Sequence, residues 1–286
     1  MKDIIIDTSS FFVTLKCNLR CKHCCTGAPY AKDSEHLPLD NLEYAIGRCF
    51  EVVKYIRKFS FTGGEPLLRT DLDCLINKVL LHKEQFDVFE IVTNGTIVPD
   101  ERVVDVISQN SDKMYVMIDR YGELSINADK AYDIFRSSGI ECHIREYGGG
   151  NAYSGGWVDL GSYTRKHSLD EAKKIFKSCN IVNKKKTNTA TRDMFSFSDS
   201  GDFLIIYCTI FNGQLHYCGR SAATLRTLGM SQNAGDYTDI VDPNVNITDI
   251  RERIVNMYRA RTPTACAYCN GELDSSPRVV PAQQIQ

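Results

Sequence analysis

Hydrophobic residues follow two alternating patterns along the first half of the chain. Short β-prone runs predict strands at 11–15, 58–61, 88–92, 114–118 and 140–145. Apolar positions at helical spacing predict helices between them, at 40–56, 72–81, 101–108 and 128–137. Strands that alternate with helices form parallel sheets, so we expect an α/β fold whose sheet curves into a full or partial barrel.

The second half of the chain is less regular. We expect a helix at 169–177, a β-hairpin at 203–217 that turns at Asn212-Gly213, and another helix at 247–259. The stretch 147–164 is rich in Gly, Ser and Tyr and carries the only tryptophan, Trp157, which is typical of a loop over a barrel mouth or of a connector. The lysine run at 184–186 predicts a solvated loop, and the segment from Pro277 predicts irregular structure.

Residues that could take part in catalysis or binding directly follow several of the predicted strands. In barrels of this kind the functional residues lie at the carboxyl ends of the strands. We therefore expect one face of the sheet to gather Cys17, Gly63 to Glu65, Asn94, Asp119 and Arg145.

Composition and charge narrow the class of protein. The 286 residues are 43% hydrophobic and 24% charged, which is typical of a folded domain and not of a disordered chain. The net charge of -2 lacks the basic excess that nucleic-acid binding needs, and no apolar run reaches the length of a membrane span. The start of the chain does not resemble a secretory signal, so we expect a cytoplasmic protein.

Twelve cysteines are many for a cytosolic chain, and they gather near both ends. Cys17, Cys21 and Cys24 lie on one short loop, where three thiolates can hold three corners of an iron–sulfur cubane and leave the fourth iron open. The alternative is a structural zinc loop in which His23 or Cys25 supplies the fourth ligand. Otherwise Cys25 is expected to be a small buried apolar residue.

The cysteine spacing, together with Gly63-Gly64-Glu65-Pro66 after the next strand, resembles the radical S-adenosylmethionine (SAM) enzymes. The resemblance implies a (βα)6 TIM-like partial barrel in which Cys17, Cys21 and Cys24 ligate a 4Fe-4S cluster. It also implies that S-adenosylmethionine binds the open iron and is cleaved to a 5'-deoxyadenosyl radical, which takes a hydrogen atom from the substrate.

The same resemblance assigns the residues around S-adenosylmethionine. Glu65 and the backbone carbonyls at Gly63 and Gly64 would accept hydrogen bonds from the methionyl ammonium. His23 would lie against the adenine. Asn94 would contact the ribose and Arg145 the methionyl carboxylate, while Asp119 and Tyr121 would face the substrate. The alternatives are a surface role for His23, a turn at Asn94 and a surface salt bridge for Arg145.

The cysteines of the last third extend the resemblance to the SPASM or twitch type of auxiliary-cluster domain. No cysteine follows Cys269, so the short form with one auxiliary 4Fe-4S cluster fits better. The expected ligands are Cys179, Cys218, Cys266 and Cys269. Cys208 is the alternative to Cys179, but the hairpin alternation points it away from Cys218. A four-cysteine zinc site is the alternative for the whole group.

These expectations divide the chain into a radical SAM barrel at 1–165 and an auxiliary-cluster domain at 166–286. Cys49, Cys74 and Cys142 are expected to be buried apolar residues.

The resemblance extends in general terms to 2-deoxy-scyllo-inosamine dehydrogenase. It implies an oxidoreductase that oxidises a small polar substrate, such as a sugar or aminocyclitol, and passes an electron to the auxiliary cluster. An external one-electron reductant such as flavodoxin or ferredoxin would supply electrons to the first cluster. The alternatives are a maturase that crosslinks or epimerises a ribosomally made peptide, and a non-catalytic metal-binding protein.

Overall fold

The structure is a computed structural model that describes residues 3–31, 36–148, 152, 156–164, 166–181, 195–197, 203–229, 235–260 and 262–285. The lysine run at 184–186 and its predicted loop lie outside these residues. None of the helices in the described ranges is long and apolar enough to cross a membrane.

One large sheet organises the described residues. Nine strands join it, in the order β10-β9-β8-β1-β2-β3-β4-β5 with β7 paired to β8. Their bounds are β1 Asp3–Thr14, β2 Tyr55–Gly63, β3 Phe86–Thr93, β4 Met114–Arg120, β5 Glu141–Glu146, β7 Phe195–Phe197, β8 Phe203–Phe211, β9 Gln214–His216 and β10 Tyr237–Asp239. Strands β8, β1, β2, β3, β4 and β5 run parallel, which gives the sheet the character of a partial barrel.

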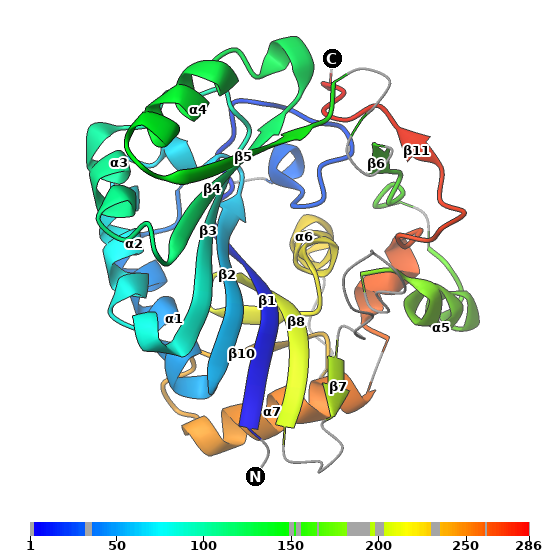
Figure 1. Cartoon of the computed structure of the whole chain (residues 1–286). Coiled ribbons are helices and arrows are strands. Elements are labelled where there is room, and N and C mark those ends of the chain that lie inside the picture. The colour runs from blue at the N-terminus through cyan, green and yellow to red at the C-terminus, as the bar shows by residue number, and fades with distance from the viewer. Residues whose placement is uncertain are drawn as a thin grey trace.

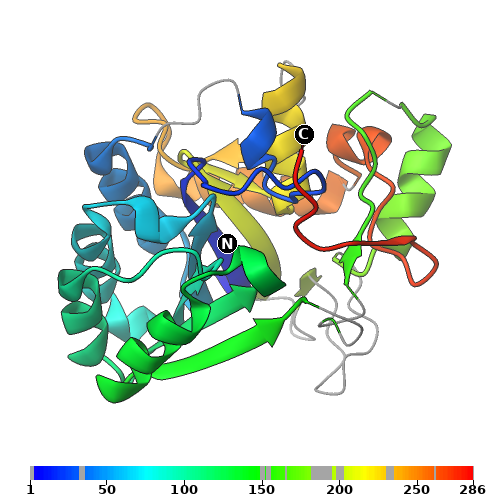
Figure 2. The ribbon, with the colours of Figure 1, turned by 90° about the horizontal axis from the view of Figure 1, so that it is seen from above.

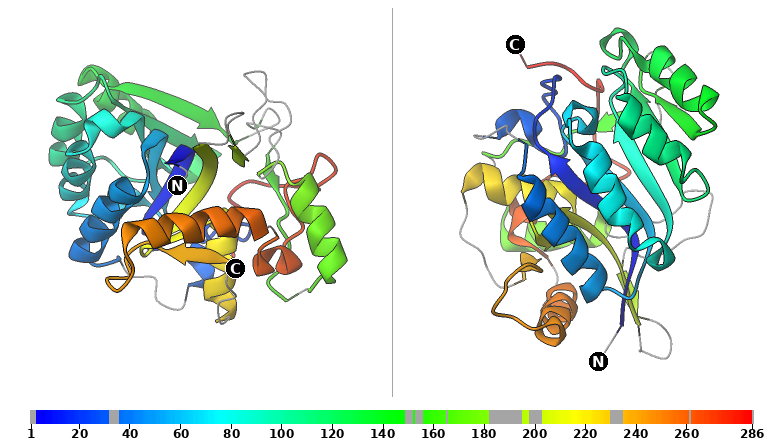
Figure 3. Two further views of the ribbon diagram at one scale, coloured as in Figure 1. Left: turned by 90° about the horizontal axis from the view of Figure 1, so that it is seen from below. Right: turned by 90° about the vertical axis from the view of Figure 1, so that its left-hand side faces the viewer.

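Four helices cover the outer face of the sheet (Figure 1): α1 Leu39–Val52, α2 Leu72–Leu80, α3 Glu101–Ser108 and α4 Ala128–Ser137. Helix α7, Ile247–Ala260, packs against α1 and β10 (Figure 3). On the inner side stand α6, Gly219–Leu228, and α5, Leu169–Ser178. A small antiparallel sheet of β6 and β11, Trp157–Val158 and Arg278–Val279, lies on the same side. Short 3-10 turns occupy Ala28–Tyr30, Pro66–Leu68, Lys83–Gln85, Gly122–Leu124 and Thr264–Tyr268.

The two faces of the sheet differ because side chains alternate along each strand. Phe59, Phe61 and Phe89 are fully buried on the outer face, where Phe50 of α1 stacks on Phe59 at 5.5 Å between ring centroids. The rings of Phe61 and Phe89 meet edge to face at 4.8 Å. Several intervening positions, among them Ser60, Thr62 and Glu90, carry polar side chains and face the interior of the partial barrel. The main hydrophobic core therefore lies outside the sheet, and the candidate site lies inside it.

The predicted alternation of strands and helices is confirmed, and α3 and α4 have the predicted bounds. The hairpin is also confirmed, with a turn in which Asn212 and Gly213 adopt φ values of 47° and 74°. Its first strand, β8, pairs with β1 in the main sheet, so the sheet continues across the expected boundary at 165, and the two-domain division stays a prediction. The segment from Pro277 includes β11 and is more ordered than expected.

Two of the expectations for isolated cysteines are wrong. Cys49 and Cys142 are buried, as expected, but Cys74 and Cys25 are exposed. Helix α2 buries Leu72, Leu75, Ile76 and Val79, and Cys74 lies off that stripe. Cys25 is accessible because it lines internal cavities, which are described below.

Candidate active site

The first three cysteines lie on the loop that follows β1. Successive turns shape this loop, because the Cys24 amide donates to the Cys21 carbonyl and the Gly27 amide donates to the Cys24 carbonyl, both at 3.2 Å. Cys21 is buried, while Cys17 and Cys24 are partly exposed. The loop therefore presents three thiols from one short, ordered segment.

Each of the three sulfur atoms has a polar neighbour. The Leu19 amide donates to Cys17 Sγ at 3.4 Å, Gln284 Nε2 donates to Cys21 Sγ at 3.4 Å, and Thr26 Oγ1 lies 3.1 Å from Cys24 Sγ. Burial raises the pKa of Cys17 to about 11 and that of Cys21 to about 12. Three thiols on one loop form a soft donor set that fits an iron–sulfur cluster, and cluster binding would displace their protons.

Gly63 and Gly64 pack against the start of the cysteine loop. Gly63 has φ +129°, and a Cβ atom there would lie 2.2 Å from the Thr14 carbonyl oxygen. A Cβ atom at Gly64 would lie 2.1 Å from the Lys16 carbonyl oxygen. The Gly64 amide donates to the Thr14 carbonyl at 2.7 Å, and the Glu65 amide donates to the Lys16 carbonyl at 2.9 Å. These two hydrogen bonds connect the end of β2 to the start of the cysteine loop.

Glu65 is fully buried, and both of its carboxylate oxygens are hydrogen-bonded. Oε1 accepts from the Leu67 amide at 3.0 Å and from Thr93 Oγ1 at 2.8 Å, and Oε2 accepts from the Asn94 amide at 2.7 Å. Burial raises the pKa of Glu65 to about 7, against the opposing effect of these donors. The side chain thus links the ends of β2 and β3, and its contact with a methionyl ammonium stays a prediction.

Asn94 lies beside Cys17 at the end of β3. Its Nδ2 donates to Asn18 Oδ1 at 3.1 Å and lies 3.7 Å from Cys17 Sγ. Its Oδ1 accepts from the Thr96 amide at 2.9 Å. Asn94 therefore joins the loop after β3 to the cysteine loop.

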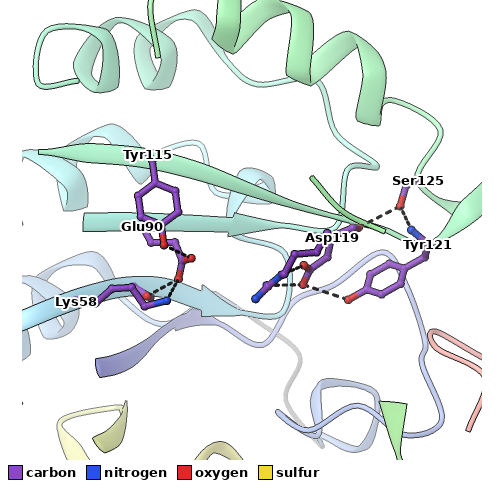
Figure 4. A network of polar contacts seen from close by, with 8 residues as sticks. Lys58, Glu90, Tyr115, Asp119, Tyr121 and Ser125 are labelled. Atoms are coloured by element: carbon purple, nitrogen blue, oxygen red, sulfur yellow. Dashed lines mark hydrogen bonds and ion pairs between the residues drawn. The ribbon is translucent and has the colours of Figure 1, made fainter. Parts of the chain in front are cut away.

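Arg145 and Asp119 form a two-pronged ion pair at the ends of β5 and β4. Arg145 Nε and Nη2 lie 2.5 and 3.0 Å from the Asp119 carboxylate, and Tyr121 donates to the same carboxylate at 3.4 Å. Figure 4 shows Asp119 and Tyr121 side by side at this edge. Burial raises the pKa of Asp119, and Arg145 opposes that rise. A contact of Arg145 with a methionyl carboxylate stays a prediction.

His23 lies at the margin of the site. Its Nδ1 is 3.5 Å from Asp159 Oδ1 on the segment after β6, and its side chain is 16% exposed. His23 is absent from the residues that line the cavity beside Cys17, Cys21 and Cys24, so an adenine contact also stays a prediction.

Two adjoining cavities occupy the inner side of the sheet. The first, of about 120 Å³, is lined by the three loop cysteines and by Gly63, Gly64, Asn94, Asp119 and Trp157. The second, of about 250 Å³, reaches from the strands to Cys179, Cys218, Cys266 and Cys269. Cys25, Thr26 and Thr62 line both cavities, so the two spaces share a wall.

The four later cysteines come from three elements that meet on the inner side. Cys218 caps the start of α6, Cys179 follows α5, and Cys266 and Cys269 belong to the turn at 264–269. Backbone amides donate to three of the sulfur atoms: Ser221 to Cys218 and Glu272 to Cys179 at 3.4 Å, and Gly271 to Cys269 at 3.3 Å.

These four thiols surround a space and do not meet at one point. Within the described ranges, no three His, Cys, Asp or Glu side chains stand close enough to share a single ion. In a cubane each thiolate binds a different iron, so its ligands are spread around the cluster. Cys208 is fully buried on β8 among the residues of the outer core and does not line the cavity.

The comparisons with known proteins identify the domain. Residues 11–141 match the family model described as the Radical SAM superfamily. The chain carries a radical SAM domain. The matched range holds Cys17, Cys21, Cys24 and Gly63 to Glu65, and the family resemblance is thereby confirmed. Enzymes of this superfamily use a 4Fe-4S cluster and S-adenosylmethionine.

Curated relatives match part of this chain. GTP 3',8-cyclase of Helicobacter pylori strain 26695 is 40% identical over 94 residues, 32% of this chain and 28% of that protein. The enzyme of the same name from Aliarcobacter butzleri is 36% identical over 95 residues, again 32% and 28% of the two chains. The chain thus spans less than a third of these relatives.

A solved structure matches this chain along its whole length. BtrN, in a crystal structure with AdoMet and 2-DOIA, aligns over 100% of both chains with a TM-score of 0.50 at 15% identity. This likeness shows the fold and confirms the expected α/β partial barrel.

Sequence analysis missed the residues that reach the site from distant segments. Gln284 contacts Cys21 from the C-terminal segment, and Arg220 of α6 lines the second cavity with its guanidinium over the Tyr163 ring at 3.9 Å. No local pattern marks either position. The period-two alternation of the strands could have indicated Thr209, which lies on the inner face of β8.

A second polar cluster lies deeper in the radical SAM barrel (Figure 4). Glu90 accepts from Ser60 at 2.7 Å and from Tyr115 at 2.5 Å, and Lys58 lies 3.2 Å away. Burial alone would raise the pKa of Glu90, but Lys58 and the two hydroxyl donors outweigh it and hold this pKa below its ordinary value.

We expect Glu90→Gln to destabilise the protein by about 1–3 kcal/mol at neutral pH, because it loses these charge-assisted bonds. Because the pKa of Glu90 is lower in the folded protein than in the unfolded chain, its carboxylate contributes fully to the free energy of unfolding above about pH 5. This contribution is lost as the pH falls through the pKa of the folded state. Urea unfolding of the apoprotein should therefore show a deficit that shrinks below about pH 4, whereas Glu252→Gln, at an exposed site, shows none. A deficit that is independent of pH contradicts the assignment.

Proposed function

We propose that the protein is a radical SAM oxidoreductase that oxidises a small polar substrate of the sugar or aminocyclitol kind. The observation that carries the proposal is the pair of adjoining cavities, each lined by one group of cysteines and both lined by Cys25, Thr26 and Thr62. A substrate in the shared region is close to both groups. This placement suits alcohol oxidation, in which a hydrogen atom leaves the carbon on one side, the hydroxyl proton passes to solvent and the remaining electron leaves on the other side.

The chain's own residues divide into three sets in this proposal. Cys17, Cys21 and Cys24 hold the first 4Fe-4S cluster, and Cys179, Cys218, Cys266 and Cys269 hold an auxiliary one in a twitch-type arrangement. S-adenosylmethionine occupies the first cavity, whose lining includes Gly63, Gly64 and Asn94. In this proposal it also contacts His23, Glu65 and Arg145, which lie outside that lining. When bound, the first cluster and S-adenosylmethionine would supply a 5'-deoxyadenosyl radical that takes a hydrogen atom from the substrate. The auxiliary cluster would accept the electron that remains on the substrate.

Hydroxyl groups in the second cavity support a polar substrate. Ser10 Oγ and Tyr207 OH lie 3.4 Å apart, and the fully buried Thr209 Oγ1 has no partner among the described residues. Binding pockets place a few such polar groups within a mostly apolar lining to orient a ligand. The cavity of about 250 Å³ suits a small molecule better than a peptide segment.

The remaining parts of the proposal concern location and partners. We propose a cytoplasmic protein, because free thiols of this number persist in a reducing compartment. A one-electron carrier such as flavodoxin or ferredoxin would reduce the first cluster. The GTP 3',8-cyclase matches cover too little of those proteins to bring their reaction to this chain.

The test is 5'-deoxyadenosine formation by the anaerobically reconstituted, reduced protein, with small-molecule and peptide fractions of the source cell supplied separately. Stimulation by the small-molecule fraction supports the proposal, and stimulation by peptides alone favours the maturase. A wild-type yield no greater than that of a Cys17, Cys21, Cys24→Ala variant refutes radical chemistry. Iron and acid-labile sulfide in the purified protein separate clusters from zinc.

The choice of the fourth auxiliary ligand gives a separate prediction. We expect Cys179→Ala to remove about four irons per chain, because Cys179 lines the second cavity with the other three thiols. Cys208→Ala is the matched control, since Cys208 lies on β8 in the outer core, and it should keep the wild-type iron content. Iron loss in the control with retention in Cys179→Ala would reverse the assignment.

A further inference from the structure

The C-terminal segment reaches back to the first cysteine loop. After β11 pairs with β6, the Lys22 amide donates to the Gln283 carbonyl at 2.7 Å and the Ile285 amide to the Arg20 carbonyl at 2.8 Å. These bonds flank an antiparallel bridge between Cys21 and Gln284. Figure 2 shows the red C-terminal segment ending beside the blue loop.

The Gln284 side chain is fixed by three contacts. Its Oε1 accepts from the Arg20 amide at 2.7 Å, and its Nε2 donates to the Ala282 carbonyl at 2.6 Å and to Cys21 Sγ at 3.4 Å. Only the carbonyl oxygen can accept from an amide, and only the amino group can donate to a carbonyl, so the orientation of the side chain is determined. One N–H bond of Gln284 therefore points at the Cys21 sulfur.

This contact lies in a shielded place. Leu19, Cys21 and Ala282 are 8%, 6% and 1% exposed and pack together, and Tyr121 and Trp157 pack against them. Hydrogen bonds are electrostatically stronger where water is excluded. The Gln284 contact with the Cys21 sulfur is therefore partly shielded from water.

We propose that Gln284 is a positioning residue that raises the reduction potential of the cluster held by Cys17, Cys21 and Cys24. Reduction adds negative charge to the cluster and its thiolates, and a donor to a thiolate stabilises that charge. The inference rests on the proposed function only in taking Cys21 as an iron ligand. It adds a role for the C-terminal segment, which holds the donor in place through its backbone bonds to the cysteine loop.

The test compares two neighbouring glutamines in the full-length, reconstituted protein. Gln284→Glu keeps an oxygen for the Arg20 amide but loses the donor to sulfur, while Gln283→Glu makes the same charge change on an exposed side chain. Gln284→Met removes the donor without adding charge. Potentials are read by mediated titration followed by electron paramagnetic resonance, using the cluster signal that S-adenosylmethionine alters.

We expect Gln284→Glu and Gln284→Met to shift the midpoint to more negative values. At a fixed potential this is roughly a two- to tenfold fall in the ratio of reduced to oxidised cluster, the equivalent of one hydrogen bond. Gln283→Glu should stay near the wild type. Equal shifts in both Glu variants, or no shift in Gln284→Met, overturn the inference. A wild-type protein without a signal that responds to S-adenosylmethionine refutes the proposed function instead.

Discussion

Replacing Cys24 by Ala is expected to lower 5'-deoxyadenosine formation by more than about a hundredfold. Loss of a partner that only supports a metal ligand costs 10- to 100-fold, and loss of the ligand itself removes an anchor that no neighbour replaces. Thr26 Oγ1, 3.1 Å from Cys24 Sγ, is a neutral hydroxyl and a poor substitute for a thiolate on iron. The measurement is nucleoside yield per chain under reducing, anaerobic conditions.

Cys74→Ala provides the matched control for this variant. Cys74 is exposed on α2, outside the residues that line both cavities, so its replacement should leave the yield and the iron content unchanged. A Cys24→Ala protein with wild-type yield would show that the first loop does not hold the reactive cluster.

The second large effect concerns the glycine pair. In Gly64→Ala the new methyl group would lie 2.1 Å from the Lys16 carbonyl oxygen and 2.6 Å from its carbon, both backbone atoms that cannot rotate away. We expect a loss of about 2–4 kcal/mol in the free energy of unfolding, together with a fall in bound iron, because Lys16 precedes Cys17. Urea unfolding of the apoprotein and iron analysis measure the two effects.

Gly47→Ala tests whether the Gly64 effect is local. Gly47 lies within α1, and a Cβ atom there meets nothing within 4 Å. Alanine in a helix interior should change stability by no more than about 1 kcal/mol, in the stabilising direction. Similar losses in both variants would contradict the steric explanation for Gly64.

The sequence predicts the parts of this protein that depend on short-range pattern. The spacing of Cys17, Cys21 and Cys24 and the Gly63-Gly64 pair lie on single loops, so their neighbourhood follows from the strands that precede them. The hairpin around Asn212-Gly213 likewise places Cys208 and Cys218 on different faces, as the structure has them.

The sequence does not predict features that depend on distant pairing. Gln284 meets Cys21 across 263 positions, and nothing near either residue indicates the contact. The sequence around Arg145 allows either a contact with a methionyl carboxylate or a salt bridge. Its ion pair with Asp119 depends on the pairing of β4 with β5, which no local pattern indicates. The membership of β8 in the main sheet is set by its pairing with β1, which local periodicity does not reveal.

The pairing of β8 with β1 has a consequence for synthesis of the protein on the ribosome. Ile4 pairs with Leu204, so one edge of the first strand stays open until about 200 further residues have been made. Open strand edges recruit other chains. The unpaired N–H and C=O groups of this edge therefore stay exposed until β8 has been made, and chaperone binding during that interval would keep the edge from pairing with other chains.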